Sequence, residues 1–230
     1  MMKTNIVSLA VAATMAITSI PAWAGEPLKA DFGTDIVSTY VWRGQMLDHA
    51  AVQPTLGLEW GGLSFSAWGS TGLVSDFREL DFTLSYSIGG LTLGFTDYWC
   101  ADSIAPYFDF TSETPHVVEL NLGYDFGPVA VNWYTNCLGA VGCAPDGSAA
   151  YSSYLEVSAP FTLGGLDWSA AAGASPWAND YYGAEGFSVV CISLQASKDL
   201  TVGSASIPAF AQIMTNPTTK KAYFTVGLSF

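Results

Sequence analysis

The chain has 230 residues, half of them hydrophobic and 12% charged, and a formal net charge of -13. Seven basic side chains are too few to neutralise a nucleic-acid backbone, so a nucleic-acid partner is excluded. The 14% of aromatic residues excludes a disordered chain, and because only two histidines and four cysteines are present, we expect neither a metal site nor a cofactor.

Residues 1–24 are predicted to be an export signal. Lys3 is the only charged residue in this stretch, an apolar run extends from Ile6 to Ile17, and Ala22-Trp23-Ala24 resembles a signal-peptidase cleavage site. We therefore expect one mature domain over residues 25–230. No cysteine follows the cleavage site, so a lipid anchor is not indicated.

Apolar and polar residues then alternate with a period of two, as residues 81–88 and 118–125 illustrate. This alternation is typical of β-strands that have one apolar and one polar face. No run of 18 or more apolar residues follows the signal, so an α-helical membrane span is excluded.

Turn signals divide the chain into hairpins. Gly-Gly pairs at 61–62, 89–90 and 164–165 supply the positive φ values that two-residue turns require, and residues 125–128 and 198–199 are interpreted as two further tight turns. Longer polar segments separate the hairpins, at about residues 44–50, 70–78, 99–115, 137–149, 175–185 and 214–220. Five short turns that alternate with six long loops predict twelve strands. The expected fold is all-β, a transmembrane antiparallel up-and-down β-barrel.

Aromatic residues lie near both ends of the expected strands, as in the interfacial girdles of membrane barrels. They are Trp60, Tyr86, Tyr124 and Trp168 beside short turns, and Tyr40, Trp42 and Trp133 beside long loops. The alternative is a secreted β-sandwich whose apolar faces meet in a core. The scarcity of Lys and Arg, the one-sided placement of long loops and the last strand favour the barrel.

The first predicted hairpin carries a series of motifs: Ser38, Tyr40, Trp42-Arg43-Gly44, Gln53-Pro54, Gly61-Gly62, Trp68 and Ser70. Over about residues 35–70 this series resembles the TorF family of small Gram-negative outer-membrane porins. Beyond that stretch only the spacing of strands and turns is similar. The resemblance implies an outer-membrane location and a channel, and it implies no particular solute.

The last predicted strand, residues 222–230, places its apolar side chains on one face. It resembles the terminal strand of Gram-negative outer-membrane proteins, in which this pattern belongs to the assembly signal. The residues concerned are Phe224, Val226, Leu228 and Phe230. The resemblance implies the barrel-assembly machinery as a partner, and outer-membrane lipid and lipopolysaccharide as surroundings. The alternative is an ordinary sheet strand that ends in Phe.

Residues that alternate with the lipid-facing set must point into the barrel. Most of them are small, so we expect few bulky side chains in the lumen and a narrow aqueous passage. The charged members of the set, predicted to line the pore, are Asp35, Arg43, Glu59, Glu79, Asp81, Glu119, Asp125, Glu156 and Asp167. If residues 44–50 close the first hairpin, Asp35 lies nearly opposite Glu59, a pairing of like charges that favours a wet, cation-attracting lumen. Arg43 is interpreted either as a constriction residue or as a structural Arg of the rim paired with carboxylates.

The four cysteines allow one local disulfide. Cys137 and Cys143 bracket five residues that include two glycines, so we expect them to be joined in an oxidising envelope. Cys100 and Cys191 are either a second pair or two separate thiols.

These observations predict a passive outer-membrane channel for small hydrophilic solutes that prefers cations, with both termini in the periplasm. The first alternative is a non-conducting structural or adhesin-type barrel that acts through its extracellular loops. The second is a hydrolase at the rim, where His49 and His116 lie near acidic residues; these are Asp48, Asp97, Asp102, Asp109 and Glu113. No spacing motif joins these residues into a catalytic set, so we do not expect an enzyme.

Overall fold

The computed structural model describes residues 17–20, 27–101, 106–111 and 114–230. Most of the predicted export signal, including the cleavage site after Ala24, lies outside the described residues, so its removal stays a prediction. Four residues of the predicted signal form the short strand β1 (Ile17–Ile20), which pairs antiparallel with β2. Within the described part of the chain, no helix is long and apolar enough to cross a membrane.

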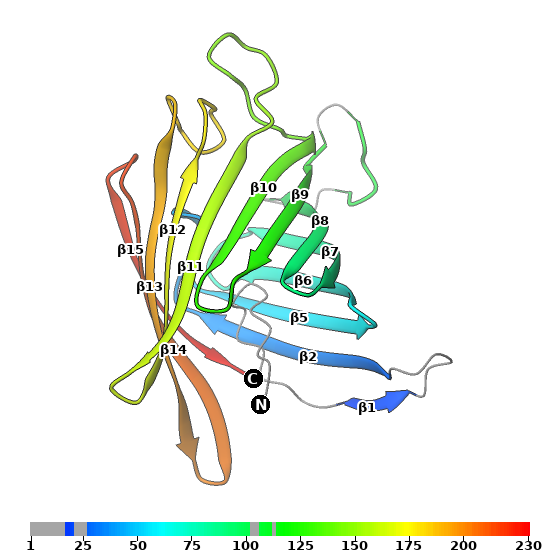
Figure 1. The fold of residues 1–230 in the computed structure, drawn as a ribbon, viewed down its shortest axis with the longest axis vertical. Coiled ribbons are helices and arrows are strands. Elements are labelled where there is room, and N and C mark those ends of the chain that lie inside the picture. Colours follow the sequence, from blue (N-terminus) through cyan, green and yellow to red (C-terminus); the bar gives the residue numbers. More distant parts are fainter. Residues whose placement is uncertain (1–16, 21–26, 102–105, 112–113) are drawn as a thin grey trace.

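Twelve strands form the body of the molecule. They are β2 (Leu28–Val37), β5 (Ala51–Trp60), β6 (Leu63–Gly72), β7 (Arg78–Ile88), β8 (Leu91–Ala101), β9 (His116–Asp125), β10 (Ala130–Gly139), β11 (Ser153–Leu163), β12 (Leu166–Ser175), β13 (Ser188–Val202), β14 (Ala205–Asn216) and β15 (Lys221–Ser229). Each strand pairs antiparallel with its neighbours in the chain, and β2 pairs with both β5 and β15. The sheet therefore closes on itself, and the predicted twelve-stranded antiparallel up-and-down barrel is confirmed (Figure 1).

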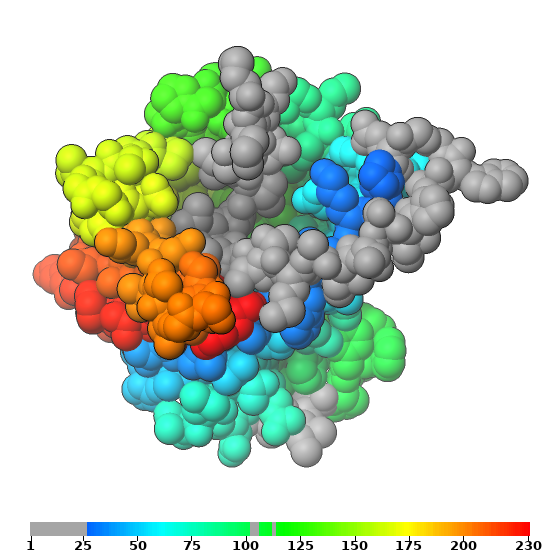
Figure 2. Space-filling model, turned by 90° about the horizontal axis from the view of Figure 1, so that it is seen from below, coloured from blue at the N-terminus to red at the C-terminus, as the bar shows by residue number. Residues whose placement is uncertain are grey.

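Short turns and long connections lie at opposite ends of the barrel (Figure 1). Four of the five predicted tight turns are where we expected them, but the turn predicted at 198–199 is wrong. Strand β13 continues past Lys198, which pairs with Ala209, and turns only at Gly203, whose φ of 64° suits a two-residue hairpin. The β13–β14 hairpin thus extends beyond its neighbours at the short-turn end, where it is orange in the view from below (Figure 2).

The outer surface of the barrel is apolar. Large side chains on the outward phase of the strands are exposed to about half of their area, for example Phe95 at 48% and Leu122 at 46%. The last strand follows the same rule, because Phe224 is 60% exposed whereas its neighbour Thr225 is 5% exposed and faces the interior. Trp60, at 46%, also faces outward, as predicted for a girdle residue.

Candidate constriction inside the barrel

A short hairpin between β2 and β5 folds into the barrel. Its strands are β3 (Tyr40–Trp42) and β4 (Gln45–Asp48), joined by Arg43 and Gly44 with φ values of 48° and 79°. Two successive positive φ angles define the type I′ turn that suits a two-residue hairpin. The tip contacts residues of β9, β10, β11, β13 and β14, and one segment can reach these five strands only from inside the barrel.

Glycine at the tip permits this approach. A Cβ added to Gly44 would lie 2.0 Å from the carbonyl oxygen of Val190 on β13. The Gly44 amide donates a hydrogen bond to Sδ of Met214 at 3.1 Å, and Nδ2 of Asn216 donates to the Gly44 carbonyl at 3.2 Å. The tip of the hairpin is therefore fixed to β13 and β14.

Arg43 forms an ion pair with Glu119 of β9. Its Nη1 lies 2.5 Å from Oε2 of Glu119, and its Nη2 donates to Oε1 at 3.0 Å. The hydroxyl of Tyr98 also donates to Oε1, at 3.0 Å. Since the Arg43 side chain is 9% and the Glu119 side chain 1% exposed, this is a buried, two-point pair, the geometry in which arginine and carboxylate bind most strongly.

Aromatic rings enclose the Arg43 guanidinium. The guanidinium carbon lies 4.4, 4.1 and 4.7 Å from the ring centroids of Trp42, Tyr134 and Tyr154, within the range of cation–π attraction. Nη1 of Arg43 also donates to the Tyr182 hydroxyl oxygen at 2.9 Å. We call Trp42, Tyr134, Tyr154 and Tyr182 the aromatic cage.

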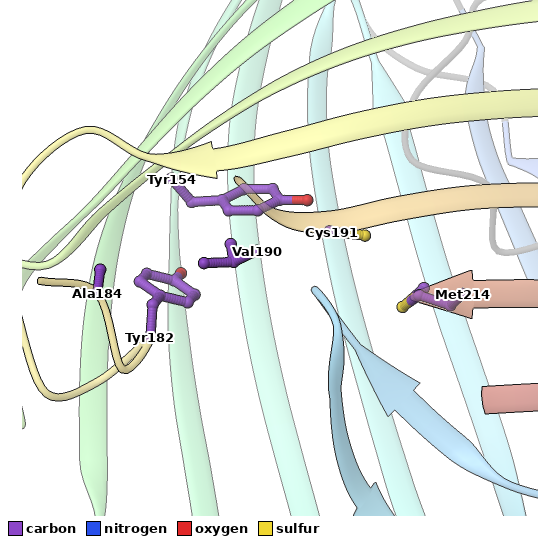
Figure 3. Packing of buried hydrophobic residues seen from close by; sticks show 6 residues of the cluster. All are labelled: Tyr154, Tyr182, Ala184, Val190, Cys191 and Met214. Carbon is purple, nitrogen blue, oxygen red and sulfur yellow. The ribbon is translucent and has the colours of Figure 1, made fainter. Parts of the chain in front are cut away.

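The cage rests on buried neighbours. Tyr182 stacks on Tyr154 with ring centroids 5.7 Å apart, and the buried side chains Val190, Cys191 and Met214 pack beside them (Figure 3). Gly173 of β12 provides the room for Tyr154, because a Cβ at position 173 would lie 1.9 Å from the Tyr154 hydroxyl. The expectation that few bulky side chains fill the lumen is therefore wrong at this level of the barrel.

The charge of Arg43 is held by its surroundings. Burial opposes the charged guanidinium, but the adjacent Glu119 carboxylate outweighs this effect and raises the pKa of Arg43 well above its usual value. For Tyr182, burial raises the pKa to about 12, so this hydroxyl stays neutral near pH 7. The constriction thus holds a guanidinium that keeps its positive charge beside the Glu119 carboxylate.

The register of the first hairpin differs from the prediction. Asp35 pairs with Gln53, and Glu59 pairs with Lys29, so the expected opposition of Asp35 and Glu59 is wrong. The reason is that residues 38–50 hold an inserted hairpin, which displaces the pairing of β2 and β5 relative to a simple loop. Glu59 instead faces a basic residue, and the like-charge argument for a wet lumen does not apply at this pair.

The other predicted pore residues lie on inward positions of the strands, in different settings. Asp125 accepts a hydrogen bond from the Gly127 amide at 2.7 Å, Glu156 from the Tyr154 hydroxyl at 3.0 Å, and Asp167 from the Thr162 hydroxyl at 3.2 Å. Glu79 and Asp81 are 6% and 8% exposed. Only Glu119 among these carboxylates binds Arg43.

Several lumen residues were not predicted, although a signal was present. Tyr98, Tyr134 and Tyr154 fall on the polar phase of their strands, which the register places inside. Tyr40 and Trp42, predicted as girdle residues beside a long loop, also lie inside. There the Tyr40 ring contacts the Trp68 ring at a tilt, with ring centroids 5.5 Å apart. The available clue was an aromatic residue at a polar position of the alternating pattern, because such a residue points into the barrel.

The cysteines do not form the predicted bond in this structure. Cys137 belongs to strand β10 rather than to a loop, and its Sγ donates to the Val118 carbonyl at 3.2 Å, while Cys143 is an exposed thiol. Cys100 and Cys191 lie on β8 and β13, which are not neighbours in the sheet, and are not joined. Pairing of Cys137 with Cys143 in an oxidising envelope stays a prediction.

The two histidines do not meet. His116 has Nδ1 2.9 Å from Asp97 Oδ1 and Nε2 2.7 Å from the Tyr107 carbonyl oxygen, so both ring nitrogens are engaged. His49 follows β4, where its backbone amide donates to the Asp48 carboxylate at 2.7 Å. Asp102 and Glu113 lie outside the described residues. The described part of the rim therefore does not assemble the histidines into one site.

A hollow of about 640 Å³ lies at the long-loop end, above the cage. It is lined by residues 139–143, Ala149, Asp180 and Tyr181. Tyr181 contacts Trp42 edge-on, with ring centroids 6.3 Å apart. Through Tyr181, the hollow between the long loops adjoins the aromatic cage.

No protein family, curated protein or solved structure matches this chain. The functional argument therefore rests on the fold and on the constriction itself.

Proposed function

We propose that the protein is an outer-membrane channel that conducts small hydrophilic solutes passively, through a lumen narrowed by the hairpin of residues 40–48. The outward apolar side chains support the membrane location, because a closed barrel leaves no unpaired backbone edge in lipid. In this proposal residues 1–24 direct export, the short turns and both termini are periplasmic, and the long loops are extracellular. Membership of the TorF family is part of the same proposal.

The observation that carries the proposal is the position of Arg43. A barrel whose interior served only as a core would be expected to fill with apolar side chains, since a buried ion pair contributes little net stability compared with apolar packing. Here a guanidinium and a carboxylate face each other within the lumen, held by tyrosine hydroxyls and rings. Opposed fixed charges at a narrow point are a means of selecting solutes by size and charge.

The charge of the remaining lumen supports a preference for cations. Glu119 is matched by Arg43, whereas Asp35, Asp125 and Asp167 on inward positions have no basic partner among the ion pairs of the described residues. Unmatched carboxylates give the lumen a negative potential that concentrates cations and repels anions.

Swelling of vesicles that contain the refolded barrel tests the proposal. We expect small neutral and cationic solutes to enter faster than anionic solutes of equal size, and large sugars to be excluded. A second candidate function is a non-conducting barrel that binds partners through its loops, which the cage inside the lumen and the hollow beside Asp180 favour. Well-inserted barrels that admit no solute would support that candidate and contradict the channel.

A further inference from the structure

Two carboxylates of strand β7 lie together in the lumen without a positive partner. Glu79 and Asp81 are two residues apart on the inward face and are 6% and 8% exposed. Oε2 of Glu79 and Oδ1 of Asp81 are both buried, and neither has a hydrogen-bond partner. A buried carboxylate without a partner is costly, and two of them on one face of a strand also repel each other.

Within the described residues, neither carboxylate forms an ion pair with a basic side chain. The ion pairs among the described residues are Arg43–Glu119 and His116–Asp97, and the Arg43 guanidinium is fully engaged by Glu119 and the cage. The groups that surround the pair are hydroxyls, rings and one thiol. Ser70 and Cys100 lie opposite Glu79, with the Cys100 thiol hydrogen-bonded to the Glu79 side chain, and Trp68 and Tyr98 lie opposite Asp81. The Tyr40 hydroxyl interacts with the Glu79 carboxylate.

We propose that Glu79 and Asp81 bind a divalent metal cation inside the barrel, through their unpartnered oxygens Oε2 and Oδ1. Carboxylate oxygens are the ligands that hard cations such as Ca²⁺ and Mg²⁺ prefer. The occupant is an ion rather than an organic cation, because both side chains are almost fully buried, with 6% and 8% of their area exposed.

The proposed site should bind its cation weakly, because only two carboxylates form it. Within the described residues no group of three or more His, Cys, Asp or Glu side chains could hold a metal ion, so water and hydroxyl groups complete the coordination. Two small side chains, Thr83 and Ser85, follow the pair on the same face of β7 toward the short-turn end. Weak binding suits a conduction path, in which an ion must leave as readily as it enters. This role rests on the proposed channel, whereas the binding itself does not.

Terbium luminescence tests the binding in micelles, independently of conduction. Tb³⁺ replaces Ca²⁺ at oxygen sites, and Trp68 opposite Asp81 is placed to sensitise its emission. We expect emission on excitation of tryptophan that Ca²⁺ competes away. We also expect at least about tenfold weaker binding in Glu79→Gln, Asp81→Asn and the double variant, because the number of charged ligands sets affinity. Glu59→Gln is the matched control, since Glu59 is an exposed inward carboxylate that faces Lys29; its binding should be unchanged.

Thermal unfolding provides a second readout that does not depend on the probe. Ca²⁺ should raise the Tm of the parent protein and leave the Tm of the double variant unchanged. In excess chelator the double variant should be at least as stable as the parent, because it lacks the buried repulsion. Absence of Ca²⁺-competed emission from the folded parent would overturn the proposal and indicate protonated carboxyl groups instead. Equal loss of emission in Glu59→Gln would overturn it as well.

Discussion

Arg43 and Glu119 are 76 residues apart in the chain, yet their side chains form a two-point ion pair inside the barrel. The pair joins the tip of an inserted hairpin to strand β9, on the wall of the barrel. Because both side chains are buried and the surrounding tyrosines orient them, the hairpin has one defined position in the lumen. In the proposed channel, this position sets the width of the lumen.

Removing one partner of the pair should destabilise the barrel strongly. We expect Arg43→Met and Glu119→Gln each to lower the free energy of unfolding by about 3–5 kcal/mol, because each leaves a buried polar group without its partner. The double variant should lose less than the sum of the two, and the difference measures the coupling. Urea unfolding of the refolded barrel in micelles gives these values.

Arg78→Met is the control for this cycle, since Arg78 is exposed at the end of β7 and should change stability by less than about 0.5 kcal/mol. Strict additivity of the Arg43 and Glu119 substitutions would show that the pair contributes no coupling energy.

The position of Tyr154 should depend on Gly173. A methyl group there would meet the Tyr154 ring and hydroxyl, the nearest atom lying 1.9 Å away, so Gly173→Ala should cost about 1–3 kcal/mol through overpacking. It should also displace Tyr154 from Arg43 and change conductance. Gly186→Ala is the matched control, because no atom lies within 4 Å of its added Cβ. If both variants unfold at the same denaturant concentration, the packing described for the cage is incorrect.

Neighbouring residues on opposite faces of β11 should respond differently to charge. Val157 is 43% exposed on the outer surface, so Val157→Arg should cost about 2–4 kcal/mol in a bilayer. Ser158 faces the interior opposite Ala130, and Ser158→Arg should be inserted nearly normally. Folding into lipid vesicles, followed by electrophoretic mobility before and after heating, compares the two. A barrel that tolerates both substitutions equally does not present this face to lipid.

Neutralising exposed lumen carboxylates should weaken the preference for cations. Glu59 and Asp167 are inward and exposed, and Glu59→Gln combined with Asp167→Asn should lower the cation-to-anion permeability ratio without unfolding the barrel. The preference should fade at high salt, as the Debye length falls from about 10 Å at 0.1 M to about 3 Å at 1 M. Reversal potentials across a salt gradient measure the ratio. Anion selectivity of the parent protein would be inconsistent with the negative lumen.

The barrel itself could be predicted from the sequence because its two signals are local. Alternation over 81–88 fixes which side chains face outward, and the Gly-Gly pairs mark the turns. The turn predicted at 198–199 failed because a charged dipeptide also suits an exposed strand extension. The charge carries no backbone requirement, whereas Gly203 adopts a positive φ. Glycines that can adopt a positive φ therefore marked the turns more dependably than charged residues did.

The constriction could not be predicted in full because it depends on contacts distant in sequence. The sequence predicts Arg43 either as a constriction residue or as a rim residue paired with carboxylates. The structure shows it paired, with Glu119 on the distant strand β9. The inserted hairpin within residues 38–50 also changed the register of β2 and β5, which made the predicted pairing of Asp35 and Glu59 wrong. The partners of Arg43 and Gly44 lie on β9, β13 and β14, far along the chain, so the local sequence of residues 38–50 does not specify them.

Single-channel recording of the parent protein and of Arg43→Ala in a planar bilayer tests the constriction most directly. Removal of the guanidinium releases the hairpin from Glu119 and empties the aromatic cage, so we predict small, uniform conductance steps for the parent and clearly larger, less uniform steps for the variant. Arg43→Lys should fall between them, because lysine keeps the charge but cannot form the two-point pair. Identical conductance in all three proteins, or no conductance from well-folded parent barrels, would contradict the account.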